Sequence, residues 1–367
     1  VAELQEAMLG QDIGVGVGGG GVDADGVSGE LVDTDGLLIQ VAFQGGEGVA
    51  FGQSGEPVGE AVIVGMHARP DNPELLKAQE LGIPVESYPS FLYKQSLNKQ
   101  RIVIAGSHGK TSITSMVLHV LKTLGRKFDY LVGARIEGFE LMASLSDAPI
   151  IIIEGDEYLA SPIDRRAKFL LYQPHICLIS GIAWDHINVY PTFESYTDSF
   201  KTLIAGLPKA GSLFFDQTDS VLNDLTADCP EHCEKTGYEA HPAKIENGQT
   251  ILRGEDGKSY PIHVFGEHSL KNLNGARLIC EQIGVSPTDF YEAIATFKGA
   301  AKRLELVASS ETSLLYKDFA HAPSKVKATT QALKNQFPSR KLVACLELHT
   351  FSSLNPAFLP EYAGTLD

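Results

Sequence analysis

One stretch limits the possible folds more than any other: residues 101–126, RIVIAGSHGKTSITSMVLHVLKTLGR. Residues 102–105 form a compact, largely β-branched run, which is typical of a buried parallel strand. From Ile113 to Leu124 the apolar residues recur with helical spacing and form one stripe. The segment therefore predicts a strand, a loop and a helix in direct succession, which is the repeating unit of an α/β fold.

The loop between this strand and helix contains residues suited to binding a phosphate. Its residues are Gly106, Ser107, His108, Gly109, Lys110, Thr111 and Ser112. A glycine-rich loop that enters a helix N-terminus directs backbone N–H groups at one point and favours a phosphate there. Lys110 is then predicted to reach the terminal phosphates of a nucleotide, and the Thr111 hydroxyl to hold Mg²⁺. The general P-loop pattern also asks for glycine where this chain has Ile104, so a plain turn with an exposed lysine is the alternative interpretation.

Composition narrows the class of protein. A chain of 367 residues suggests two or three domains. The net charge of −16 argues against a nucleic-acid partner. We find no apolar run long enough to cross a membrane and no signal peptide, and the five scattered cysteines fit a reducing compartment, so a cytoplasmic location is expected. Cys229, His232 and Cys233 offer only three close metal ligands, and we favour a surface loop over a zinc site there.

The first 60 residues differ from the rest. They hold 11 acidic residues, no basic residue and 16 of the 36 glycines. The glycines of residues 13–29 suggest a dinucleotide-binding turn, but we see no clear strand before them and no helical period after them. We therefore expect an atypical segment over residues 1–60, for which disorder is one interpretation. Residues 61–97 resemble the remainder of a small α/β domain.

Two further apolar runs end in residues suited to catalysis. Ile150–Ile153 leads directly to Glu154, and Ile176–Ile179 is followed by Asp185 and His186. Ligands of parallel α/β sheets bind at the carboxyl ends of the strands, so we expect these side chains beside Lys110. Glu154 supplies the hard oxygen that Mg²⁺ prefers. For each residue taken alone, a solvent-facing polar residue at a strand end is the alternative.

The remaining pattern predicts a central domain over residues 98–299. Within it, residues 212–265 are expected to form smaller antiparallel strands, followed by helices at 268–283 and 287–297. Residues 300–367 predict a strand, a loop, a helix and a second strand that begins at Lys341. A parallel α/β domain usually has more strands than this, so an incomplete third domain is expected.

Several motifs together resemble those of the Mur ligases, ATP-dependent enzymes that add amino acids or peptides to UDP-N-acetylmuramic acid. They are GSHGKTS, EGDEY, WDHINVYPTFESY, GEHSLKNLNGA, FKGAAKRLE and DFAHAPSK, and the resemblance extends from about residue 62 to the end of the chain. It implies a three-domain α/β architecture with a central P-loop parallel sheet, a poorly recognisable UDP-binding N-terminal domain and a truncated Rossmann-like C-terminal domain. It also implies a family-specific P-loop, which accounts for Ile104.

The resemblance assigns roles to individual residues. It implies that Lys110 binds the β- and γ-phosphates, that Thr111 and Glu154 hold Mg²⁺, and that His186 serves a second metal ion or the acyl phosphate. The residues that it places around the nucleotide are His268 and Asn272 on the adenine side, with Arg303 and Asp318 approaching from the third domain. The departures from the family pattern are Ser269 and Ser180, where relatives often have asparagine, and Lys201, which lies only near the position of a carbamylated lysine.

The stretch DEYLASPIDRRAKF resembles the subgroup that recycles the tripeptide L-alanyl-γ-D-glutamyl-meso-diaminopimelate. In the implied reaction, the carboxylate of UDP-N-acetylmuramate attacks the γ-phosphate of ATP, and the acceptor amine then attacks the acyl phosphate. Arg165, Arg166, His349 and Ser352 are available to the peptide, although the two arginines equally fit a solvated surface. The alternatives are L-alanine as the acceptor, a P-loop phosphotransferase without a UDP-sugar substrate, and an inactive remnant.

Overall fold

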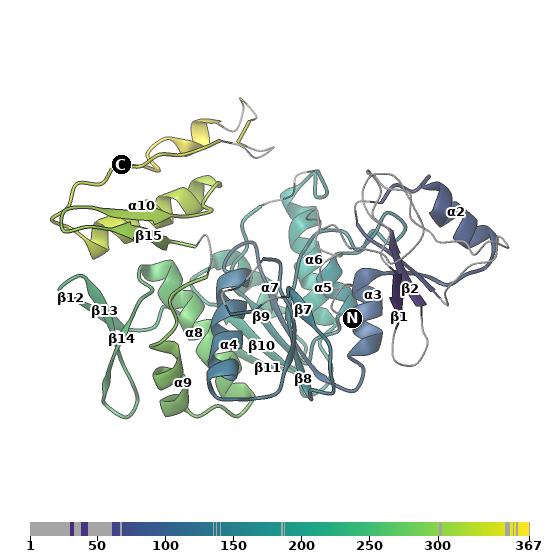
Figure 1. Cartoon of the computed structure of the whole chain (residues 1–367), viewed down its shortest axis with the longest axis horizontal. Coiled ribbons are helices and arrows are strands. Elements are labelled where there is room, and N and C mark those ends of the chain that lie inside the picture. The colour runs from purple at the N-terminus through teal and green to yellow at the C-terminus, as the bar shows by residue number, and fades with distance from the viewer. Residues whose placement is uncertain are drawn as a thin grey trace, which may run out of the picture.

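The structure is a computed structural model (Figure 1). It describes residues 30–32, 38–42, 61–66, 68–134, 136, 138–139, 141–184, 186, 188–300, 303–348, 353–354, 356 and 359–366. A seven-stranded sheet occupies the middle of the molecule, with a smaller N-terminal sheet on one side and a C-terminal unit on the other. This arrangement confirms the expected α/β fold class. The domain boundaries that we expect at residues 60, 97 and 299 stay predictions.

The N-terminal sheet has the strand order β1-β2-β3-β4. Its elements are β1 (Glu30–Val32), β2 (Leu38–Ala42), β3 (Ala61–Val64), α2 (Pro73–Glu80) and β4 (Val85–Ser87). Because β1 and β2 come from the first 60 residues, part of that segment contributes strands, contrary to an interpretation as disorder throughout. The glycine-rich residues 13–29 lie outside the described residues. Val62, Val64, Leu75 and Ala78 form the small core of this unit.

The central sheet has the order β11-β10-β9-β5-β8-β6-β7 and is parallel except for the edge strand β7. Its strands are β5 (Gln100–Ala105), β6 (Asp129–Leu131), β7 (Ala143–Ser144), β8 (Ile150–Glu154), β9 (Ile176–Ile179), β10 (Ser212–Asp216) and β11 (Glu234–Tyr238). We expected Ser212–Asp216 to belong to an antiparallel unit, and this expectation is wrong. All five of its residues are buried, as in a parallel strand covered on both faces.

Helices cover both faces of the central sheet. They are α3 (Tyr88–Gln95), α4 (Lys110–Thr123), α5 (Lys168–Leu171), α6 (Phe193–Ala205), α7 (Ser220–Ala227), α8 (Glu267–Gln282) and α9 (Pro287–Ile294). Alternate residues of β5 point to opposite faces. Ile102 and Ile104 pack in the core with α4, α8 and α9, whereas Val103 and Ala105 pack with α3, α5, α6 and α7. This central position of β5 fixes the loop that follows it. Helices α8 and α9 confirm the two helices predicted here.

The last part of the chain forms two smaller units. They comprise β12 (Ala243–Glu246), β13 (Gln249–Arg253) and β14 (Ser259–Ile262), and then β15 (Glu305–Ser309), β16 (Leu314–Lys317), α10 (Pro323–Gln336) and the 3₁₀ turn η1 (Leu359–Tyr362). The two units touch where Gln336 Nε2 donates to the carbonyl of Gly248 (2.8 Å) and where Phe265 packs on Tyr316 and Phe337. The strand expected from Lys341 onward is absent, since residues 341–348 have no regular structure and Val343 is 81% exposed.

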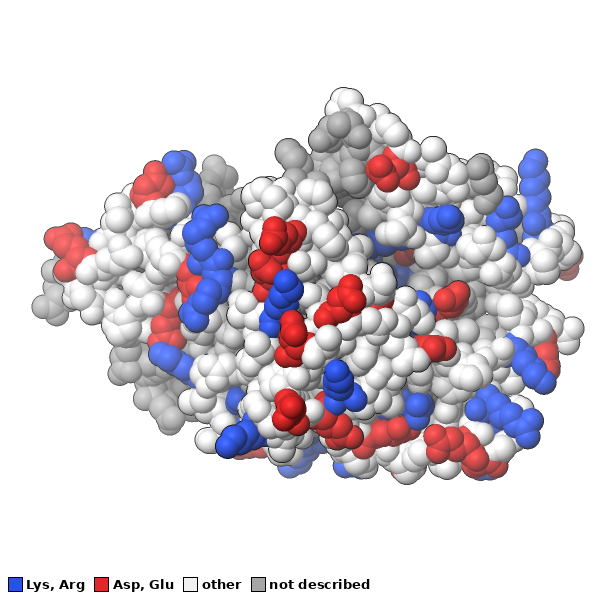
Figure 2. Space-filling model, turned by 180° about the vertical axis from the view of Figure 1, so that it is seen from behind, with Lys and Arg blue, Asp and Glu red and all other residues white. Residues whose placement is uncertain are grey.

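On the face drawn in Figure 2, positive and negative side chains are interspersed over the described surface. Within the described residues, no helix has both the length and the apolar character needed to span a membrane.

Candidate active site

The glycine-rich loop runs from the end of β5 into the first turn of α4 and confirms the predicted strand, loop and helix. Gly106 and Gly109 have φ angles of 123° and 80°, which favour glycine because other residues are strained there. Space is also limited: a Cβ on Gly109 would lie 2.5 Å from Asn272 Oδ1 of α8. The loop is therefore held between β5, β9 and α8, and Lys110 and Thr111 begin the helix, with Ser112 next in sequence.

Lys110 lies at the centre of the site. Its Nζ donates to the carbonyl of Gly106 (2.7 Å) and to Glu157 Oε2 (2.5 Å). The carboxylate of Glu157 is almost fully buried, and the lysine side chain is 15% exposed. Burial lowers the pKa of Lys110, but the negative charges of Glu157, Asp156 and Glu154, together with the hydrogen bond to Glu157, raise it overall. The lysine therefore carries a positive charge where a phosphate is expected.

Glu157 was missed by the sequence analysis, which selected Glu154 at the strand end. Besides Lys110, its carboxylate contacts His186 Nε2 (3.3 Å) and accepts a hydrogen bond from the Tyr196 hydroxyl (3.2 Å). Burial alone would raise the pKa of Glu157, but Lys110 and His186 lower it to about 2. The signal was present, because the quoted stretch EGDEY contains this residue directly beyond the strand.

Glu154 and Thr111 meet as predicted. The Thr111 hydroxyl donates to Glu154 Oε1 (2.8 Å), and the N–H of Gly133 donates to Oε2 (3.0 Å). Burial raises the pKa of Glu154, and the hydrogen bond from Gly133 opposes this change. A half-buried carboxylate beside a hydroxyl is a pair of hard oxygen donors, which is the chemistry that Mg²⁺ selects. These two residues therefore fit the metal that we assigned to them.

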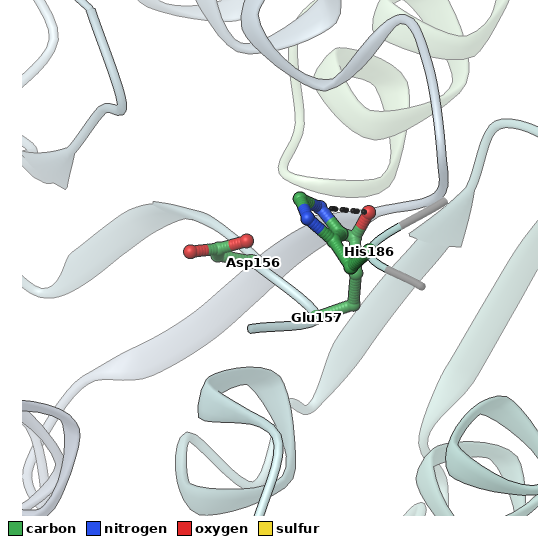
Figure 3. A group of neighbouring side chains, drawn as sticks. All are labelled: Asp156, Glu157 and His186. Carbon is green, nitrogen blue, oxygen red and sulfur yellow. Dashed lines mark ion pairs between the residues drawn. The ribbon is translucent and has the colours of Figure 1, made fainter. Parts of the chain in front are cut away.

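His186 lies at the same end of the sheet, with a φ angle of 53°. Figure 3 shows it facing Glu157, with Asp156 on the adjoining stretch of chain. Ligand atoms of these three residues lie within 4.8 Å of one another, the one such group of metal-binding side chains among the described residues. Lys168 forms an ion pair with Asp156, in which its Nζ lies 2.7 Å from Asp156 Oδ2. Asp185 lies outside the described residues.

Two further residues of the loop, Ser107 and His108, contact neighbouring parts of the site. Ser107 Oγ hydrogen-bonds the Tyr196 hydroxyl (2.7 Å) and accepts from the N–H of Ala183 (2.8 Å). His108 is exposed to solvent on one side and lies against Gly181 on the other; this contact and the positive charge of Lys325 in α10 lower its pKa.

The residues predicted around the nucleotide divide into two groups. Asn272 contacts the loop at Gly109, and His268 lies one turn earlier on α8, where burial lowers its pKa. Arg303 lies over the ring of Phe319 (5.1 Å), and Asp318 accepts from the N–H groups of Leu304 (3.3 Å) and Phe319 (2.8 Å) and from the Thr329 hydroxyl. The structure therefore brings Asn272 to the loop and brings the negative charge of Asp318 near His268 of α8, where it opposes the lowering of the pKa of that histidine.

Other sequence candidates are also placed. Arg166 pairs with Asp164 on the surface (2.7 Å), in keeping with the solvated interpretation of that arginine. His349 and Ser352 lie outside the described residues. Lys201 is half exposed and pairs with Asp198 (3.1 Å). In the CPEHC stretch, His232 Nε2 lies 3.1 Å from the carbonyl oxygen of Leu207, and Cys233 Sγ donates to the carbonyl of Pro208 (3.4 Å).

Comparisons with known proteins agree with the fold. Residues 104–280 match the model of the Mur ligase middle domain. A UDP-N-acetylmuramate–L-alanine ligase of Sulfurihydrogenibium is 29% identical over 88% of this chain and 71% of its own. The Escherichia coli UDP-N-acetylmuramate–L-alanyl-γ-D-glutamyl-meso-2,6-diaminoheptandioate ligase is 28% identical over 80% of this chain and 66% of its own. Both acceptor types are thus represented among similar proteins.

Solved structures of ligases that act on UDP-N-acetylmuramate are also similar to this chain. The tripeptide ligase of Neisseria meningitides has a TM-score of 0.57 and 25% identity, and the match covers 65% of this chain and 79% of that one. The UDP-N-acetylmuramate–alanine ligase of Thermotoga maritima has a TM-score of 0.58 and 20% identity, over 80% of this chain and 67% of that one. The fold is that of the Mur ligases. Residues 104–280 are thus similar to the middle domain of the Mur ligases, and the homologues of this chain are ATP-dependent ligases that form amide bonds.

Proposed function

We propose that this chain joins the tripeptide L-alanyl-γ-D-glutamyl-meso-diaminopimelate to UDP-N-acetylmuramate at the expense of ATP, as a step in the recycling of cell-wall peptides. One observation carries the proposal of an ATP site. Lys110 with Glu157, and Thr111 with Glu154, gather at the carboxyl ends of the adjacent strands β5 and β8. This is the edge at which ligands of parallel sheets bind.

The residues take complementary roles in this reaction. Lys110 binds the β- and γ-phosphates and exchanges its contact with Glu157 for the phosphate oxygens. The adenine lies toward His268 and Asn272, and Arg303 and Asp318 reach the nucleotide from the C-terminal unit. The UDP-sugar binds to the N-terminal domain. Its carboxylate attacks the γ-phosphorus of ATP, so that ADP leaves and an acyl phosphate forms. The acceptor amine then attacks the acyl carbon, and the amide forms with loss of inorganic phosphate and a proton. Closure of the three parts brings the reactants together and excludes water.

Mg²⁺ would be held by Thr111 and Glu154, and when bound it neutralises charge on the phosphates. His186, with Asp156 and Glu157, offers ligands for a second divalent ion. This group offers two carboxylates and one imidazole nitrogen as ligands. Because Mg²⁺ prefers oxygen ligands, the group is less selective for Mg²⁺ than Thr111 and Glu154 are.

Substitution of Glu154 with glutamine tests the first of these positions. The change removes an anionic ligand while keeping the shape of the side chain. Because even outer-shell partners of metal ligands contribute about 10- to 100-fold to affinity, we expect the Mg²⁺ concentration for half-maximal ligation to rise at least about tenfold. A Mg²⁺ titration of the initial rate measures this, with Glu194→Gln on α6 as the matched control. An unchanged titration curve would make Glu154 a structural residue.

The choice of acceptor rests on residues 156–168. The N–H of Lys168 donates to the carbonyl of Tyr158 (2.9 Å), so the residues between them form a closed loop. The side chain of Lys168 pairs with Asp156 beside the site. Cationic side chains at this point suit an acceptor that carries several carboxylates. L-Alanine remains the second candidate, because ligases that use it are equally similar to this chain.

An acceptor comparison decides between the two. The enzyme is given ATP, Mg²⁺ and UDP-N-acetylmuramate with either the tripeptide or L-alanine, and kcat/KM is measured for each. We expect the tripeptide to be preferred at least about tenfold, because its additional carboxylates can pair with the cationic side chains of residues 156–168, which L-alanine would leave without these contacts. A preference for L-alanine would assign the enzyme to biosynthesis and leave the ligase assignment intact.

The same assay tests the two alternatives that are not ligases, a P-loop phosphotransferase and an inactive remnant. A P-loop phosphotransferase would release ADP without one of the two other substrates, and an inactive remnant would release none. ADP release that requires both UDP-N-acetylmuramate and an amine acceptor supports the ligase.

A further inference from the structure

Ser180 joins the end of β9 to the glycine-rich loop. Its backbone N–H donates to the carbonyl of Ala105 (3.0 Å), and the N–H of Ser107 donates to the carbonyl of Gly181 (3.0 Å). Its hydroxyl donates to the carbonyl of His108, and the carbonyl of Ala105 lies 3.1 Å from the same oxygen. The side chain is buried, so this hydroxyl is committed to the loop rather than to solvent.

The loop is also in close steric contact with Ser180. A Cβ on Gly106 would lie 2.5 Å from Ser180 Oγ and 2.9 Å from its backbone nitrogen. A Cβ on Gly109 would lie 3.4 Å from Ser180 Cβ. Both glycines of the loop therefore face this one serine, and the backbone of the loop has no room to shift toward β9.

The hydroxyl contact sets the direction of a backbone N–H. The carbonyl of His108 and the N–H of Gly109 belong to one planar peptide unit, and in a trans peptide they point in opposite directions. When the carbonyl is held toward Ser180, the N–H of Gly109 is turned away from β9. The N–H groups in the first turn of α4 also lack partners within the helix, so one more N–H turned the same way adds to the phosphate-binding surface.

We propose that Ser180 is a positioning residue for the phosphate-binding loop: its hydroxyl fixes the peptide unit between His108 and Gly109 so that the Gly109 N–H faces the nucleotide phosphates. This inference rests on the proposed function, because it assumes that the loop binds ATP. Ser180 does not itself touch the nucleotide, and its effect passes through the backbone of the loop.

The test compares three variants with the unmodified protein. Ser180→Ala removes the hydroxyl, and Ser180→Thr keeps it. Ser115→Ala is the matched control, since Ser115 is also buried and its hydroxyl donates to a backbone carbonyl, that of Thr111, within α4 (2.7 Å). The dissociation constant for ATP is measured by calorimetry, together with the KM values for ATP and the acceptor and the thermal unfolding midpoint.

We expect Ser180→Ala to raise the dissociation constant and the KM for ATP about fivefold, as for the loss of one hydrogen bond, while the KM for the acceptor is unchanged. Ser180→Thr and Ser115→Ala should stay within about twofold of the unmodified protein. Unchanged ATP affinity in Ser180→Ala overturns the inference and leaves the proposed function standing. Equal weakening in Ser180→Ala and Ser115→Ala, with equal loss of thermal stability, also overturns it. An unmodified protein that does not bind ATP would remove the proposed function and this inference together.

Discussion

Replacement of Lys110 with alanine should lower the rate of ATP-dependent ligation by at least about 10²–10³-fold, the usual cost of losing one group that stabilises charge in a transition state. Lys110 is the first residue of α4. Its ammonium group donates to the carbonyl of Gly106 and to Glu157, at the point where the γ-phosphate is expected. Initial rates of ADP and amide formation measure the effect. Near-normal turnover would contradict the assignment of this loop to ATP.

Two controls separate chemistry from folding in this experiment. Lys127→Ala removes an exposed lysine just beyond the other end of α4 and should leave the rate unchanged. The double variant Lys110→Ala/Glu157→Gln removes both charges of the buried pair and should be more stable than Lys110→Ala alone, because no carboxylate is left without its lysine. Its activity should nevertheless stay as low as that of the single variant.

Replacement of Glu157 with glutamine should lower the free energy of unfolding by about 3 kcal/mol in the absence of nucleotide, because it leaves the mostly buried ammonium of Lys110 without its partner. Urea denaturation measures the change. Asp198→Asn is the control, since it breaks the pair with Lys201, both of whose side chains are about half exposed, and should cost less than about 1 kcal/mol. A Glu157→Gln variant as stable as the unmodified protein would show that the pair adds no net stability.

The same variant has a pH signature. Glu157 has a pKa of about 2 in the folded protein and an ordinary value of 4.5, so folding favours its ionised form. Its contribution to stability is therefore complete above about pH 5 and is lost as the pH falls toward 2. The difference in stability between the unmodified protein and Glu157→Gln should shrink over this interval.

The sequence predicted the site where residue type and position in an element were enough. The apolar run before Gly106 and the helical stripe after it identified the loop, and the rule that ligands bind at strand ends selected Glu154, which does meet Thr111. Glu157 follows three residues later in a loop, and a one-dimensional pattern does not tell in which direction such a loop turns. Its importance comes from contacts with Lys110 and His186, residues 47 and 29 positions away in the chain.

The errors in the predicted fold have physical reasons. Ser212–Asp216 is as apolar as a buried strand, but the short strands that follow led us to place it with them rather than in the parallel sheet. The apolar stretch that begins at Lys341 has the composition of a strand, yet a strand also needs a neighbour for its backbone hydrogen bonds. In the described residues β15 and β16 pair with each other, and residues 341–348 join neither.

The strand order of the central sheet has a consequence for how the chain is made. β5 is the first strand of this sheet to leave the ribosome, yet it lies in the middle and pairs with β8 and β9. A nascent chain therefore carries an apolar strand with two open edges until Glu154 has been synthesised, and with one open edge until Ile179 has been synthesised. Parallel pairing over such separations is slow and exposes strand edges to aggregation. Until β9 arrives, the strand that leads into the glycine-rich loop keeps an apolar edge with which another nascent chain can pair.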